Sequence, residues 1–206
     1  MPAAPYQFDF SGGALCLDFV NTLGDRPRAA EEHLGDWRHL IAWGEQAHLL
    51  TSREAAADRA SAQAHPVVTD RAFARARALR EHIYRLCSAQ AAGQTPARED
   101  LAAFNDALGA AMAESRIEPR DGGFVWGWNA PTGVFDRVLW PVLRSAGDLL
   151  VSAARDDIRE CASGTCSWLF IDRSPARRRR WCSMKGCGNR DKVRRFHERR
   201  RQARSA

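Results

Sequence analysis

The sequence predicts a mainly α-helical (α+β) N-terminal domain with a small β-hairpin, joined to a small C-terminal four-cysteine module that ends in a basic helix. Apolar residues recur at helical spacing through most of the chain before Cys161. Two short runs near Arg120 have the composition of paired strands, and four cysteines follow in two pairs, starting at Cys161. These observations predict two domains, spanning residues 1–157 and 158–206.

Five helices are expected before the hairpin. Thr51-Ser52-Arg53-Glu54 has the form of a capping box, in which the hydroxyl and the carboxylate each satisfy a backbone N–H, so a helix begins there. Gly93 ends the longest of the five, because glycine favours the conformation that closes a helix. The expected helices cover residues 14–23, 34–50, 51 onward through an alanine-rich run, 66–92 and 96–115.

A β-hairpin is expected next. Residues 117–120 and 124–128 flank Asp121-Gly122-Gly123, which is typical of a hairpin turn. Helical spacing returns over residues 133–154. Pro141 predicts a kink or a break in that helix, since proline lacks the N–H that a helix interior needs. Residues 168–171 are expected to form a short strand between the two cysteine pairs.

Four residues separate the members of each cysteine pair, and fifteen separate the pairs: Cys161 with Cys166, and Cys182 with Cys187. Two such knuckles are a common frame for a tetrahedral zinc site. Two disulfides in a secreted protein are the alternative. Residues 1–5 do not begin a signal peptide, and no apolar run is long enough to span a membrane, so we expect a cytoplasmic protein with reduced thiols. The sequence therefore predicts one structural zinc ion, Zn²⁺, held by four cysteines with no position open for catalysis.

The net charge of +6 is distributed unevenly. Residues 161–206 contain fourteen Lys or Arg and three Asp or Glu, a balance of +11, so the chain before Cys161 carries −5. An acidic domain joined to a strongly basic module is typical of a protein that binds a polyanion. An arginine-rich proteome would explain the choice of arginine over lysine, but not the concentration of cations in one quarter of the chain.

The end of the chain is the expected binding surface. A helix is predicted over residues 190–202, capped by Asn189, with Val193 and Phe196 against the metal core and two basic stripes facing outward. Cations on such a helix displace the counterions of a duplex, and rigid Asn and Arg side chains can read base edges. Arg177-Arg178-Arg179-Arg180 form a second cationic surface, for which the alternative is a solvated loop. For the terminal helix the alternative is a partly disordered basic tail. The candidate nucleic-acid-binding residues are Arg177, Arg178, Arg179, Arg180, Asn189, Arg190, Lys192, Arg194, Arg195 and Arg199.

Asp18, Asn21 and Thr22 are polar residues within an otherwise apolar predicted helix. Buried polar groups need partners. These three therefore either tie loops together, which we favour, or line a pocket for a small-molecule effector. The chain shows no metalloprotease motif, phosphate-binding loop or nucleophile elbow, so we expect that it is not an enzyme.

The C-terminal residues resemble the CGNR zinc-finger proteins of bacteria. The string Arg180-Trp181-Cys182-Ser183-Met184, then Cys187-Gly188-Asn189-Arg190 and Lys192, carries this resemblance, which extends upstream to Cys161, Cys166, Phe170, Ile171 and Asp172. Leu17-Asp18-Phe19-Val20-Asn21-Thr22 resembles the opening motif of the ABATE domain that accompanies this finger. Pro175-Ala176 depart from the family, whose members often carry a charged residue and Asn there. The resemblance implies four zinc-ligating cysteines, a binding helix that starts near residues 188–190, and a stress-induced transcription regulator.

These features together predict a zinc-dependent regulator of the bacterial stress response that binds double-stranded DNA. We expect a homodimer, because one short helix buries little surface for specific DNA binding. The alternative is an RNA- or protein-binding zinc module on a helical ligand-binding domain. Single-stranded RNA is disfavoured because the basic segment lacks the interleaved aromatic residues on which bases stack.

Overall fold

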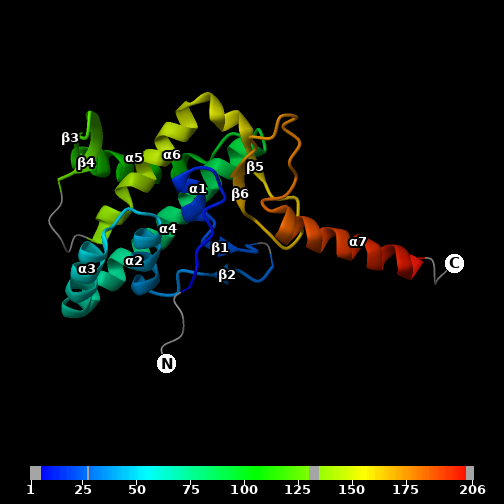
Figure 1. The fold of residues 1–206 in the computed structure, drawn as a ribbon, viewed down its shortest axis with the longest axis horizontal. Coiled ribbons are helices and arrows are strands. Elements are labelled where there is room, and N and C mark those ends of the chain that lie inside the picture. Colours follow the sequence, from blue (N-terminus) through cyan, green and yellow to red (C-terminus); the bar gives the residue numbers. More distant parts are fainter. Residues whose placement is uncertain (1–5, 27, 130–134, 203–206) are drawn as a thin grey trace.

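The computed structural model describes residues 6–26, 28–129 and 135–202, and these form a mainly helical fold (Figure 1). The α-helices are α1 Leu15–Val20, α2 Trp37–Gln46, α3 Ser52–Ala64, α4 Pro66–Ala91, α5 Arg98–Ala113, α6 Trp140–Val151 and α7 Asn189–Gln202. Two 3₁₀ turns, η1 Phe135–Val138 and η2 Ala153–Asp157, flank α6, and a π-helical turn, η3 Met184–Gly188, leads into α7. The predicted fold class is confirmed.

Three small antiparallel sheets complete the described part of the chain, each with two strands. They pair β1 Leu23–Gly24 with β2 Glu31–Glu32, β3 Ser115–Arg120 with β4 Gly123–Trp128, and β5 Ile158–Glu160 with β6 Leu169–Ile171. The second sheet is the expected hairpin, and its turn residue Gly122 has a positive φ of 78°. The strand expected over residues 168–171 is β6.

The short helix α1 lies at the centre of the main core, packed against α4 and α6. Leu17, Phe19 and Val20 are completely buried, and the Phe19 ring lies 5.1 Å from that of Trp43 on α2. Six residues are too few for a helix that is stable alone in water. Burial of each large apolar side chain contributes about 1.5–3 kcal/mol, so tertiary packing is what stabilises α1.

Local signals place several of the helix ends. Thr51 and Glu54 form the expected reciprocal capping box at the start of α3. Gly93, with φ of 66°, follows the end of α4. Pro141 lies in the first turn of α6, where its missing N–H does no harm, and the expected break falls at Leu139, between η1 and α6. Gly133 and Val134, at the start of that expected helix, lie outside the described residues.

Two predicted helices are shorter in the structure. The helix expected over 14–23 ends at Val20, because the side chains of the next two residues bond to other elements and the chain enters β1. The helix expected over 34–50 begins only after Asp36, whose carboxylate accepts from the N–H groups of Arg38 and His39. It ends before His48, which has a positive φ of 58°. The strands β1, β2 and β5 were not predicted.

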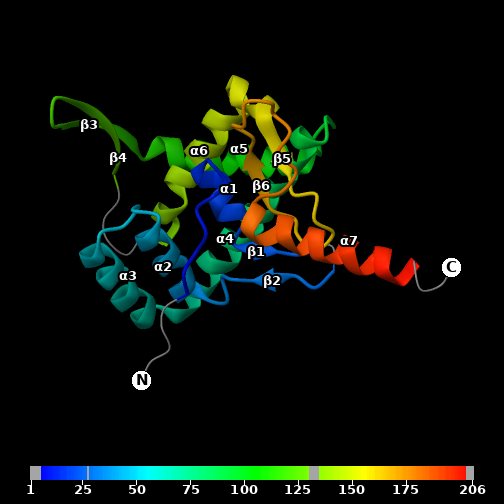
Figure 2. The same ribbon diagram turned by 45° about the vertical axis from the view of Figure 1, so that its right-hand side comes forward.

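The C-terminal elements divide between the core and the solvent. Ile158, Leu169 and Ile171, from β5 and β6, belong to the same buried cluster as the helices before them. In both views α7 projects away from the rest of the molecule, while the hairpin β3–β4 extends on the opposite side (Figures 1 and 2). Among the described helices, none is both long and apolar enough to cross a membrane.

Candidate metal centre and nucleic-acid interface

The β5–β6 ladder and the turn η3 bring the four cysteines together. Cys161 follows β5, and its N–H donates to Trp168 O at 2.9 Å, which closes the first knuckle beside β6. In the second knuckle, Ser183 caps η3: its hydroxyl accepts from Gly186 N–H at 3.2 Å. Cys187 lies within that π-helical turn. A backbone hydrogen bond in the first knuckle and a side-chain cap in the second therefore position the cysteines.

The sulfur atoms fit a zinc ion. All four Sγ atoms lie within 4.8 Å of one another, with Cys166 to Cys182 at 3.8 Å and Cys182 to Cys187 at 3.6 Å. A tetrahedral zinc ion about 2.3 Å from each sulfur requires sulfur separations of about 3.8 Å. Four protein ligands leave no coordination position for water or substrate. The four-cysteine centre accordingly binds one zinc ion in a structural role.

The electrostatics of the cluster also call for a cation. Hydrogen bonds from Cys166 and then Cys182 lower the pKa of the Cys161 thiol. The hydrogen bond with Cys161 in turn raises the pKa of Cys166 and is the first cause of the raised pKa of Cys182. Without metal, crowded thiols cannot all ionise. A bound Zn²⁺ supplies the charge that makes four adjacent thiolates favourable.

Arg190 is tied to the metal centre. Its Nη2 donates to Cys187 Sγ at 3.0 Å, and this hydrogen bond is the main cause of its raised pKa. Four thiolates around Zn²⁺ leave a net charge of about −2, which a guanidinium offsets. Arg190 thus belongs structurally to the surroundings of the zinc, at the base of α7.

The other arginines of the candidate interface differ in orientation. Arg179 points inward: it donates to the backbone oxygens of Trp181 and Cys182, and its guanidinium lies 4.4 Å from the centre of the buried Phe170 ring. Arg177, with a positive φ of 47°, forms an ion pair with Asp157 at 2.7 Å. Arg178 is exposed, and the guanidinium of Arg180 lies above the Trp181 ring. Arg177, Arg178 and Arg180 are therefore exposed, and of these four arginines Arg179 alone is partly buried.

Asp172 organises the loop that carries this run. Its side chain is fully buried, and its two carboxylate oxygens accept from Ser174 N–H at 2.9 Å and Arg179 N–H at 2.8 Å. Hydrogen bonding by Ser174 is the first cause of the lowered pKa of Asp172. One carboxylate thus fixes both ends of a turn of the loop.

On α7, most of the candidate cations are exposed. The helix carries seven Lys or Arg and two Asp or Glu, a balance of +5. Asp191 is buried and pairs with Arg194 at 2.6 Å and Arg195 at 2.9 Å. Asn189, Lys192 and Arg199 are exposed.

Two expectations about α7 are wrong. Asn189 already has helical backbone angles, because η3 runs directly into α7, so it is not an N-cap. Val193 and Phe196 do not lie on the metal core: each is 48% exposed, since α7 leaves the module after its first turn.

The three polar residues of the N-terminal motif make internal hydrogen bonds. Asn21 bridges to the finger: its Nδ2 donates to Leu169 O at 2.8 Å, and its Oδ1 accepts from Leu169 N–H at 2.9 Å. Asp18 accepts from Gly12 N–H at 2.8 Å. Thr22 accepts from the buried Arg80 at 3.1 Å. The link from Asn21 to β6 was not expected, because no local pattern signals a contact between segments so far apart in the chain.

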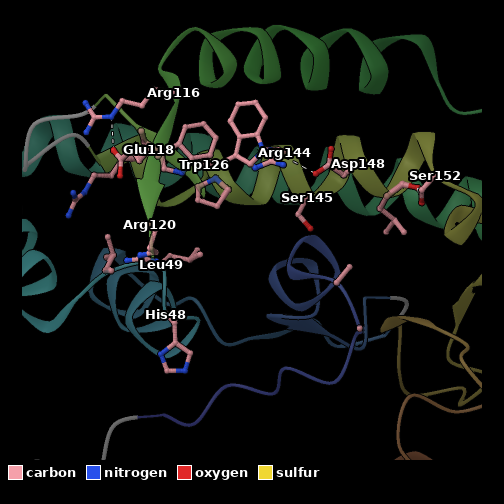
Figure 3. Close-up of a pocket in the computed structure, with 18 of the residues that line it drawn as sticks. His48, Leu49, Arg116, Glu118, Arg120, Trp126, Arg144, Ser145, Asp148 and Ser152 are labelled. Carbon is pink, nitrogen blue, oxygen red and sulfur yellow. Dashed lines mark hydrogen bonds and ion pairs between the residues drawn. The ribbon is translucent and has the colours of Figure 1, made fainter. Parts of the chain in front are cut away.

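A cavity of about 1200 Å³ lies elsewhere, between the hairpin β3–β4, α6 and the start of α1 (Figure 3). Its described lining does not include Asp18, Asn21 or Thr22. Arg144 lies over the Trp126 ring at 4.0 Å, and Ile171 and Arg173 reach the cavity from the finger. Among the described residues, the lining contains five arginines (Arg116, Arg120, Arg137, Arg144 and Arg173) and three acids (Glu54, Glu118 and Asp148).

A four-cysteine metal centre that leads into a projecting basic helix, built on a helical domain, defines a zinc-finger protein. Comparison with protein-family models agrees. Residues 13–153 match the ABATE family, described as "Putative stress-induced transcription regulator", and residues 158–200 match the CGNR zinc finger. The chain belongs to the ABATE family and carries a CGNR zinc finger, as the sequence motifs predicted. Neither description is that of an enzyme, and no curated protein matches the chain.

Proposed function

We propose that this protein is a zinc-dependent transcription regulator that binds double-stranded DNA and acts in the cytoplasm in the bacterial stress response. The observation that carries this proposal is the geometry of α7. It starts beside a zinc ligand, is fixed there by Arg190, and then projects from the molecule with a balance of +5 (Figure 1). A rigid cationic helix of this kind fits the groove of a polyanionic duplex.

The proposed contacts fall into two groups. Exposed cations of α7 and of the loop before Trp181 contact phosphates, which supply affinity without reading sequence. Asn189, exposed at the base of α7, is the residue best placed to read a base edge. Arg179 and Arg190 stabilise the module that presents the others.

Fluorescence anisotropy with a labelled duplex tests this proposal. If the zinc-loaded protein engages about five to seven phosphates, the plot of log K against log salt has a slope of about −5 to −6. Lys192→Gln and Arg199→Gln together should reduce the magnitude of that slope by about 2. The paired control, Arg53→Gln with Arg71→Gln, removes two exposed body arginines and should leave it unchanged. Absence of binding by zinc-loaded protein at low salt would reject DNA binding.

An RNA- or protein-binding module is the second candidate, and the exposed apolar edge of α7 favours a protein partner over single-stranded RNA. Val193 and Phe196 are both half-exposed along the basic helix. Competition of unlabelled single-stranded RNA against the labelled duplex separates the nucleic acids. If neither nucleic acid binds, the protein-partner candidate replaces DNA binding.

We propose further that the arginine-lined cavity holds a small anionic effector. Five arginines against three acids in the described lining favour an anion. Ile171, at the end of β6, and Arg173, just after it, line the same cavity, so the finger contacts it. A thermal-shift panel of carboxylates and phosphate esters, repeated with Arg144→Gln, tests this site. A hit that stabilises the variant as strongly as the wild type would place the effector elsewhere.

We also propose a homodimer, because a single short helix buries little area for a specific DNA complex. Sedimentation velocity on the free protein and on its duplex complex measures the stoichiometry. One protein per duplex at saturation would contradict a dimer.

A further inference from the structure

The loop between β1 and β2 places an arginine side chain beside the zinc finger. Arg26 anchors this loop: its N–H and Nη1 both donate to Ser167 Oγ, at 3.2 and 3.3 Å. Its Nε also pairs with Glu81 on α4 at 2.9 Å. Two residues further on, Arg28 is exposed beside the first cysteine knuckle. In both ribbon views this loop lies on the side of the molecule from which α7 projects (Figures 1 and 2).

Two guanidinium groups meet at Gly164, in the middle of that knuckle. A side-chain carbon placed on Gly164 would lie 3.5 Å from Nη2 of Arg28 and 3.6 Å from Nη1 of Arg194. The separation of the two nitrogens therefore cannot exceed the sum of those two distances. Because Gly164 has no side chain, the space between the cations stays open.

The two cations are not neutralised in the same way. Arg194 is held by carboxylates through its other nitrogens, with Nη2 at 2.6 Å from Asp191 and Nε at 3.9 Å from Glu198. Its Nη1 is the nitrogen nearest Gly164. Within the described part of the chain, Arg28 forms no ion pair with a carboxylate, and the turn hydrogen bond from its N–H to Asp25 O fixes only its backbone. Two like charges facing one open point favour an anion there.

We propose that Arg28 and Arg194 together bind one backbone phosphate of the nucleic acid over Gly164. This inference rests on the proposed DNA binding and extends it, because it makes the helical body part of the interface. A phosphate accepts charge-assisted hydrogen bonds of about 2.8 Å through separate oxygens, so it can bridge two guanidinium nitrogens that lie no further apart than the sum of the two distances to Gly164. The finger and the body then contact the same strand.

Anisotropy titrations of full-length, zinc-loaded protein with duplex DNA over a salt series test the proposal. Arg28→Gln should reduce the magnitude of the log–log slope by at most about 0.9, the contribution of one phosphate contact, because Arg194 remains at the site. Arg28→Lys, which keeps a cation at that position, should retain the wild-type slope. The matched control is Arg71→Gln, which removes an exposed arginine of α4 and should also retain it.

A second variant tests the shared position. Gly164→Asp places a carboxylate between the two guanidinium groups, where it takes the place of the phosphate, so it should weaken binding more than Arg28→Gln. Zinc content and far-UV circular dichroism verify that each variant is folded. If wild type binds and Arg28→Gln keeps its slope, the shared phosphate site is wrong while DNA binding stands. If wild type does not bind the duplex, both proposals fail.

Discussion

Asp18 is a buried carboxyl group whose ionisation opposes folding. It is 8% exposed, and desolvation raises its pKa to about 6, although the hydrogen bond from Gly12 N–H acts in the other direction. In the unfolded chain its pKa is about 3.9. Between those values the folded protein keeps a proton that the unfolded chain has lost. The contribution of Asp18 to stability therefore falls as pH rises through this window, and the loss is complete above about pH 6.

Asp18→Asn removes this titration and keeps an acceptor for Gly12 N–H. At pH 8 the variant should be more stable than the wild type by about 2–3 kcal/mol, the equivalent of about two pKa units. At pH 5 the gain should be about half as large. Urea denaturation of zinc-loaded protein at both pH values measures it, with Asp106→Asn on the exposed face of α5 as the control. A gain that does not change with pH would contradict the assignment.

Arg190 should matter for metal affinity. Removing its hydrogen bond to Cys187 leaves the negative charge of the zinc–thiolate centre less compensated. Arg190→Gln should weaken zinc binding by about 10- to 100-fold, the usual effect of losing a partner of a metal ligand. Competition with a chromogenic chelator measures this change. Lys192→Gln removes an exposed cation from the same helix and should leave the zinc affinity unaltered; equal losses in both variants would point to a general charge effect.

At the scale of the residue, the sequence predicts those sites whose chemistry requires fixed spacing between side chains. The four cysteines were predicted because metal ligands come from two short loops with fixed gaps. The separate roles of Arg178 and Arg179 could not be predicted, since a run of four arginines does not tell which side chain meets the Phe170 ring. The contact between Asn21 and Leu169 depends on tertiary packing alone.

At the scale of the element, α7 shows what a helical pattern can and cannot establish. Its helical state and its basic faces were predicted from spacing and charge. The apolar spacing of Val193 and Phe196 suggested burial, but a stripe becomes a core only if another element covers it. Nothing in the described residues does, because the zinc module contributes one small cluster around Phe170 and the cysteines. The two-residue strands β1 and β2 were missed because they are too short to show alternation.

Two phenylalanines should therefore differ sharply in their effect on stability. Phe196→Ala should change the free energy of unfolding by less than about 0.5 kcal/mol, as for most exposed positions. Phe170→Ala removes a completely buried ring and the surface on which Arg179 lies, and should cost about 3–5 kcal/mol. Denaturant titration of both zinc-loaded variants provides the comparison. A large loss at Phe196 would mean that α7 packs against another surface in solution.

At the scale of the whole molecule, the finger and the body share one hydrophobic core and are joined by hydrogen bonds. Ile158, Leu169 and Ile171 lie in the helical core, Arg26 bonds to Ser167, and Asn21 bonds to β6. The charge asymmetry predicts two regions, and the two family models match residues 13–153 and 158–200. The physical connection between them could not be predicted, because it is made by residues far apart in the chain.

This connection implies that zinc stabilises the helical body. Chelation should unfold the two cysteine knuckles. Strands β5 and β6 are then no longer held in place, and their three apolar side chains leave the core. Losing about 1.5–3 kcal/mol for each side chain amounts to about 5 kcal/mol or more, which for a chain of this size lowers the melting temperature by about 10 °C or more. Far-UV circular dichroism follows this transition, because most of the helix lies in the body. Adding back zinc should restore the melting temperature, and a chelator already saturated with zinc should not change it. A body transition that is the same with and without zinc would show that β5 and β6 keep their places without the metal.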